Sequence, residues 1–199
     1  QAHQSALKLM RLIDEVVDIA KTSYGTKNMT VEPVLLTEIF TDAHSLTHLQ
    51  AANRNLKLQI EEPDLSLYVM VDRARMLQLL AILIDGAIEI MREGKIVLAA
   101  YPSSEPSLLD VGIEIESPSQ IWNDSTDLLQ QLDSANLENI QSNASPLNFS
   151  PGMKLMLAQS FIETMKGHLT VLDLTKDETK PLTRLQCSIP LAPAETIAQ

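Results

Sequence analysis

Hydrophobic residues at the start of the chain recur at the three- and four-residue spacing of amphipathic helices. One such stripe runs through residues 1–24, which are therefore predicted to form a helix. Its apolar residues form a heptad seam with further apolar residues on either side. A glycine in the segment Tyr24–Asn28 ends the predicted helix. A stripe this broad is typical of a helix that has several helical neighbours, as in a bundle. The seam comprises Ala6, Leu9, Ile13, Val16 and Ala20, and the flanking apolar residues are Met10, Leu12, Val17 and Ile19.

The rest of the chain alternates between helical and strand-like patterns. Residues 117–150 are a polar connection that holds at most one short helix, at residues 127–132. The order of elements predicts the α+β class, as a two-layer sandwich in which three helices cover one face of a mixed sheet, preceded by the long N-terminal helix. Helices are predicted over about 35–53 (with Leu36, Ile39, Phe40, Ala43, Leu46, Leu49 and Gln50 in its stripe), 73–91 and 152–167, and strands over about 56–62, 95–103, 107–117, 168–174 and 182–191.

Composition narrows the functional classes. The 199 residues carry a formal net charge of −11, and no Lys or Arg lies between Lys95 and Lys154, which argues against nucleic-acid binding. No apolar run approaches the roughly 18 residues of a membrane span, and the N-terminus does not resemble a signal peptide. The single cysteine, Cys187, excludes an internal disulfide and suits a reducing, cytoplasmic compartment. The chain lacks an initiator Met, so we expect a piece of a longer protein.

Three segments, in this order, resemble sensor histidine kinases, and specifically their ATP-binding domain of the Bergerat fold. They are "VDRARMLQLLAILIDGAIEI" (71–90), "LMLAQSFIETMKGHLTV" (155–171) and "TRLQCSIPL" (183–191). The resemblance covers nearly the whole chain. It implies a dimerisation helix over residues 1–27, as part of a helical hairpin or bundle, and an ATPase-like domain over residues 28–199.

This chain differs from the family at positions that, by the resemblance, bind the metal and the nucleotide. The family has two asparagines on the helix of residues 73–91, and the second holds magnesium through its amide oxygen, a suitable hard ligand. Ile82 and Gly86 stand there in this chain. Asp85 is a carboxylate next to Gly86, but one residue along a helix is about 100° round, so we expect it to point elsewhere.

The other two motifs of the family also differ. Its Asp-x-Gly-x-Gly turn, which binds adenine, corresponds here to "ESPSQ", where Glu116 keeps a carboxylate while Pro118 and Gln120 replace the glycines. Its glycine-rich phosphate cradle corresponds to "SPGMKL". Gly152 remains there, and Lys154 is expected to be a surface lysine at a helix start.

Other candidate residues carry simpler interpretations. His3 is predicted to be exposed rather than a phosphoacceptor, since that histidine lies on an upstream helix in the family. His44 and His48 have the i, i+4 spacing of a zinc pair but no third ligand, so two partly exposed histidines are expected. His168 is expected to cap a helix or lie at a strand edge. Trp122, with Leu128, Leu129 and Leu132, is expected to pack onto the vacated nucleotide pocket or onto a partner.

The sequence therefore predicts a histidine-kinase-like module that has lost ATP binding, with no cofactor and no metal, and that acts as a pseudokinase or scaffold. Its expected partners are a second copy, bound through the N-terminal helix, and a response regulator or partner histidine kinase. One alternative is an active kinase domain that binds Mg-ATP atypically. Another is a phosphotransfer protein whose histidine helix lies upstream of Gln1.

Overall fold

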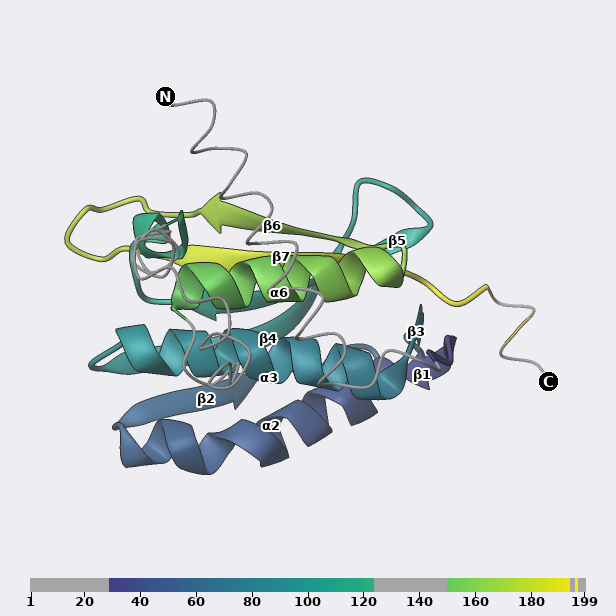
Figure 1. Ribbon diagram of the computed structural model, residues 1–199, viewed down its shortest axis with the longest axis horizontal. Helices are drawn as coiled ribbons and strands as arrows, with labels where there is room; N and C mark the ends of the chain where they lie inside the picture. The colour runs from purple at the N-terminus through teal and green to yellow at the C-terminus, as the bar shows by residue number, and fades with distance from the viewer. Residues whose placement is uncertain (1–28, 124–149, 194–195, 197–199) are drawn as a thin grey trace, which may run out of the picture.

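The structure is a computed structural model that describes residues 29–123, 150–193 and 196, and it has two layers (Figure 1). The N-terminal helix expected over residues 1–27 and the short helix expected at 127–132 lie outside the described residues. The elements are β1 (Glu32–Leu35), α2 (Leu36–Asn53), β2 (Leu56–Ile60), β3 (Tyr68–Val71), α3 (Arg73–Ile90), β4 (Gly94–Pro102), β5 (Leu108–Ile115), the 3-10 turn η2 (Ser119–Asn123), α6 (Pro151–Thr164), β6 (His168–Asp173) and β7 (Thr183–Pro190).

The main sheet has five strands in the order β2-β4-β5-β7-β6. Strands β2 and β4 are parallel, and the other neighbours pair antiparallel. Strands β1 and β3 form a separate antiparallel pair. The expected α+β sandwich with a mixed sheet is therefore confirmed for the described part of the chain.

Helices α2, α3 and α6 lie side by side over one face of this sheet, with α3 in the middle (Figure 1). The alternation along β5 explains which face they cover. Leu109, Val111, Ile113 and Ile115 are buried in the core, and the residues between them face the other side.

On that other face, β4, β5 and β7 contribute a polar cluster. Glu114 accepts hydrogen bonds from the Tyr101 hydroxyl at 2.7 Å and from Arg184 Nη2 at 2.7 Å. Gly112 makes room for it, since a Cβ there would lie 2.8 Å from the Tyr101 ring. Burial alone would raise the pKa of Glu114, but the hydrogen bonds from Arg184 and Tyr101 outweigh it and lower that pKa. Burial, with the hydrogen bond to Glu114, raises the pKa of Tyr101 to about 12.

Local signals explain where the helices begin and end. Asp72 caps α3 by accepting from the Arg75 amide at 3.0 Å, and Ser150 caps α6 by accepting from the Met153 amide at 3.3 Å. After α6, Lys166 takes a left-handed φ of 61°. Gly167 follows because a Cβ there would lie 2.5 Å from the Ser188 carbonyl oxygen.

Two expectations about local structure were wrong. Leu46 and Leu49 keep helical spacing but are exposed on α2, so the apolar stripe of that helix is narrower than predicted. The turn η2 was not predicted. Cys187 is buried, and burial raises the pKa of its thiol to about 12. Among the described residues, no helix is long and apolar enough to cross a membrane.

Candidate functional site

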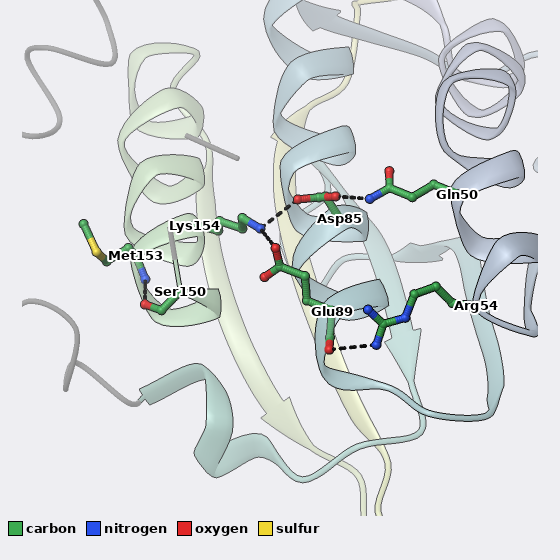
Figure 2. A network of polar contacts seen from close by, with 7 residues as sticks. All are labelled: Gln50, Arg54, Asp85, Glu89, Ser150, Met153 and Lys154. Carbon is green, nitrogen blue, oxygen red and sulfur yellow. Dashed lines mark hydrogen bonds and ion pairs between the residues drawn. The ribbon is translucent and has the colours of Figure 1, made fainter. Parts of the chain in front are cut away.

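The candidate site lies where the middle of α3 meets α6 and η2. Helix α3 is buried along most of its length, and Asp85, Gly86 and Ala87 are all buried at its C-terminal half. On one side α3 faces α2, and on the other it faces the first turns of α6 (Figure 2). Polar side chains of α2 and α6 contact α3 here, close to Asp85 and Gly86.

Lys154 reaches from α6 to two carboxylates on α3 (Figure 2). Its ammonium lies 2.7 Å from Asp85 Oδ2 and 2.8 Å from Glu89 Oε1. The lysine side chain is only 1% exposed, and those of Asp85 and Glu89 are 12% and 39% exposed. The expectation of a surface lysine was therefore wrong. A buried ammonium needs such partners because its desolvation costs several kcal/mol.

Helix α2 completes the network from the opposite side of α3. Gln50 Nε2 donates to Asp85 Oδ1, so the carboxylate is held between an amide and an ammonium. Arg54 donates from Nη2 to the Glu89 carbonyl oxygen at 3.3 Å. The Asp85 carboxylate therefore lies between Gln50 of α2 and Lys154 of α6, and only the stem of Lys154 passes close to Gly86.

Trp122 fills the space that the missing side chain of Gly86 leaves. A Cβ built at Gly86 would lie 3.0 Å and 3.2 Å from two carbons of the indole ring, and 3.5 Å from Lys154 Cδ. The indole is 1% exposed. Trp122 therefore packs against α3, while Leu128, Leu129 and Leu132 lie outside the described residues.

Within the described part of the chain, two polar atoms of the segment that follows β5 are buried without a hydrogen-bond partner. They are Trp122 Nε1 and Ser117 Oγ. The Ser117 carbonyl, in contrast, accepts from the Thr183 hydroxyl at 2.7 Å. Burying an unpaired donor is unfavourable by about 1–3 kcal/mol. The packing of the indole ring against Gly86 therefore has to offset that cost.

The structure brings only some of the predicted site residues together. Asp85, Gly86 and Lys154 are in contact or adjacent, and Gly152 is buried in the first turn of α6. Ile82 is partly buried and packs against the core. The predicted site residues of the "ESPSQ" segment, in contrast, are exposed and do not join the Lys154 network. They are Glu116, Pro118 and Gln120.

Gln50, Glu89 and Trp122 complete the site, and sequence reasoning assigned no role in it to the first two. Glu89 could have been found, since Asp85 and Glu89 are four residues apart on one helix and therefore share a face. A lysine on a facing helix then becomes their expected partner. Nothing in the sequence pattern singles out Gln50, because its role depends on how α2 packs beside α3.

The histidines that the structure describes form no site of their own. His44 and His48 are partly exposed and stacked, with ring centroids 5.1 Å apart. His168 is exposed at the start of β6, and His3 lies outside the described residues. Within residues 29–123 and 150–193, no group of three or more His, Cys, Asp and Glu side chains is placed to hold a metal ion.

No family model matches this chain, but sequence comparison finds two kinds of relative. The "Non-motile and phage-resistance protein" of Caulobacter vibrioides is 27% identical over 175 residues, which are 84% of this chain and 20% of that protein. The "Aerobic respiration control sensor protein ArcB" of Escherichia coli K12 is 29% identical over 98 residues, which are 48% of this chain and 12% of that protein. The matches thus span a fifth or less of these relatives.

Solved structures give a fuller match. Acinetobacter baumannii histidine kinase AdeS has a TM-score of 0.58 at 15% identity, covering 95% of this chain and 80% of that one. The catalytic domain of histidine kinase ThkA has a TM-score of 0.57 at 20% identity, with 81% and 96% covered. Full-length ShkA in complex with AMPPNP has a TM-score of 0.60 at 14% identity, with 98% and 40% covered. This chain therefore has the fold of the catalytic, ATPase-type domain of histidine kinases.

Proposed function

We propose that this chain is a histidine-kinase-like signalling module that does not bind ATP and acts as a scaffold through protein–protein contacts. One observation carries the proposal. The space beside α3 at position 86 is filled by the chain's own side chains, with the Lys154 ammonium 2.7 Å from Asp85 and the Trp122 indole against Gly86. An internal cation and an internal aromatic ring thus lie beside Gly86, the position to which the resemblance assigns the magnesium ligand, and this supports the proposal.

The residues at this site fit Mg-ATP poorly. Magnesium requires oxygen ligands in near-octahedral geometry, whereas Ile82 is apolar and Gly86 has no side chain. Asp85 and Glu89 do offer carboxylate oxygens, but both are engaged by Lys154. A metal ion would have to displace a buried ammonium and leave it without a counterion, which is strongly unfavourable.

The start of α6 is also a poor cradle for phosphates. Backbone amides at a helix N-terminus bind phosphates when they are free to donate. Pro151, at the first position of α6, has no amide hydrogen. The Met153 amide donates to the Ser150 hydroxyl, and the Lys154 ammonium points at carboxylates. The two carboxylates that Lys154 contacts, on Asp85 and Glu89, would also repel a phosphate that approached this ammonium.

The proposed partners follow from the rest of the chain. We propose that residues 1–27 mediate a homodimer, and that the module binds a response regulator or a partner histidine kinase in the cytoplasm. The relatives support this setting, because one of them is a sensor protein. Light scattering on the full chain tests the dimer. A strictly monomeric chain at micromolar concentration would remove that part of the proposal.

Isothermal titration calorimetry with Mg-ATP tests the loss of nucleotide binding. We expect no heat of binding at millimolar nucleotide, and a dissociation constant below about 1 mM, which is about 4 kcal/mol, would overturn the proposal. Trp122 gives an independent readout, since it is the only tryptophan in the chain. Its fluorescence should stay that of a buried indole when Mg-ATP is added. An active histidine kinase catalytic domain, titrated in the same buffer, is the positive control.

A further inference from the structure

Helix α2 carries two histidines that are arranged as a metal-chelating pair. His44 and His48 are four residues apart and therefore share one face of the helix. Both are partly exposed, and their rings are parallel within 3°, with centroids 5.1 Å apart. Each residue advances a helix by about 100°, so both lie on the side of α2 opposite to Gln50, which contacts α3.

A hydrogen bond sets the tautomer of His48 that a metal requires. His48 Nδ1 lies 3.0 Å from the His44 carbonyl oxygen. A carbonyl oxygen only accepts, so Nδ1 carries the hydrogen, and Nε2 of the neutral ring keeps its lone pair. Metal-ligating histidines usually donate from the other ring nitrogen in this way. The ring of His48 is thus oriented as a ligand, with Nε2 available.

One chain supplies only half of a zinc site. Structural zinc almost always has four ligands in a tetrahedron, with imidazole nitrogens about 2.0–2.1 Å from the metal. Within residues 29–123 and 150–193, no third His, Cys, Asp or Glu joins the pair. A second copy related by a two-fold axis brings the same two histidines, which makes four imidazoles around one ion.

The outer surface of α2 suits contact with a second copy. Leu46 and Leu49 are 61% and 67% exposed, which is high for large apolar side chains. Around the helix, Ser45 and Ala52 lie between Leu49 and His48, and both are exposed. Side chains this small let a second helix approach closely. The surface therefore has an apolar flank, a narrow middle and a histidine flank.

Charges favour an antiparallel arrangement of two α2 helices. With a two-fold axis level with Leu46, the two histidine pairs lie level with each other. Glu38 and Arg54 are each eight residues from Leu46, so Glu38 of one copy lies level with Arg54 of the other. Both are on the α3 side of α2, because Glu38 pairs with Arg73 and Arg54 donates to the Glu89 carbonyl. The two-fold axis keeps that side together, so opposite charges meet.

We propose that His44 and His48 bind a zinc ion together with the same two residues of a second copy, across an antiparallel pair of α2 helices. This contact is separate from the dimer proposed through residues 1–27, and it does not depend on the loss of ATP binding. Two different two-fold contacts in one chain build assemblies larger than a dimer. Zinc should therefore increase the size of the assembly.

Zinc chloride titration of the full chain, against a chromophoric chelator, tests the site. We expect one zinc ion per two chains, and a tetrahedral absorption spectrum when cobalt chloride replaces zinc. Losing even an outer-shell partner weakens a metal site about 10–100-fold, so His44→Ala/His48→Ala should weaken zinc binding by at least about tenfold. The matched control, His3→Ala/His168→Ala, removes as many histidines and should bind zinc like the wild type.

Leu49→Glu tests the second copy separately from the metal ligands. It keeps both histidines and changes an exposed residue, so circular dichroism and Tm should match the wild type. Sedimentation velocity should show that zinc enlarges the wild-type assembly but not that of Leu49→Glu. Zinc binding that survives His44→Ala/His48→Ala, or a ratio of one zinc per chain, would overturn the proposal. So would a zinc-dependent assembly that Leu49→Glu leaves intact, or an absence of zinc binding by the wild type.

Discussion

Replacing Lys154 by methionine should destabilise the protein far more than removing an exposed cation. Methionine keeps most of the buried stem but removes the ammonium, which leaves Asp85 and Glu89 without their common partner. Breaking a buried ion pair from one side usually costs about 3–5 kcal/mol. We expect about 3 kcal/mol, at the lower end, because Glu89 is 39% exposed and can be hydrated, and because Gln50 still donates to Asp85.

Urea unfolding of the full chain, followed by Trp122 fluorescence and circular dichroism, measures this loss. For a domain of this size, 3 kcal/mol corresponds to a fall in Tm of about 6–12 °C. The matched control is Arg73→Met. Arg73 also pairs with two acids, Glu38 at 3.0 Å and Asp42 at 2.9 Å, but its side chain is 46% exposed. Its removal should cost far less than that of Lys154, because exposed ion pairs are screened by solvent.

A second variant separates the ion pair from the packing around it. In Lys154→Met/Asp85→Leu both members of the closest pair become apolar, so no carboxylate at position 85 is left without its ammonium. Such replacements are often neutral or stabilising compared with the intact pair. We expect the double variant to recover more than half of the loss. If Lys154→Met costs no more than Arg73→Met, the network is in effect solvated and the reasoning is refuted.

Three further predictions concern other parts of the molecule. Cys187 should react with a thiol reagent at neutral pH only as fast as the protein unfolds, because its thiol is buried with a pKa of about 12; fast labelling of the folded protein would contradict this. Since the pKa of Glu114 is lowered in the folded protein, the stability that its ion pair with Arg184 contributes should be present above the unfolded pKa and lost as pH falls through the folded pKa. The stability difference between wild type and Glu114→Gln should therefore shrink in acid, and a constant difference would argue against it. Gly86→Ala should destabilise the protein despite the roughly 1 kcal/mol that alanine gains in a helix, because its Cβ would lie 3.0 Å from the buried Trp122 ring; an increase in Tm would show that the ring retreats easily.

The fold was predictable from the sequence because its signals are local. Along β5 every second residue from Leu109 to Ile115 is apolar and lies in the core, and α3 and α6 begin at side-chain caps, Asp72 and Ser150. Such patterns place elements to within a few residues. The exposure of Leu46 and Leu49 was not predictable in the same way. A helical stripe indicates which residues share a face, but the width of the neighbouring elements decides how many of them are covered.

For the candidate site, the sequence showed which side chains of the family are missing but not which side chains occupy their place. Comparing residue types at positions 82 and 86 reveals that two expected asparagines are missing, but it does not reveal what takes their place. Lys154 follows Asp85 by 69 residues, and Gln50 precedes it by 35. Contacts of such separation depend on the tertiary arrangement of α2, α3 and α6. For this reason Lys154, considered alone at a helix start, appeared to be an ordinary surface lysine.

The residues at this site depend on one another, so changing Gly86 alone to the asparagine of the family is not expected to restore a nucleotide site. Gly86 is compatible with the structure because Trp122 occupies the space beside it, and a larger residue at position 86 would collide with the ring. Asp85 is compatible with burial because Lys154 and Gln50 both contact its carboxylate. Gly86→Asn alone would therefore introduce an amide where the indole already lies, and would leave the ammonium in place. We expect it to lower stability without creating affinity for Mg-ATP, and measurable binding by this single variant would show that the internal side chains yield to a ligand more readily than their packing implies.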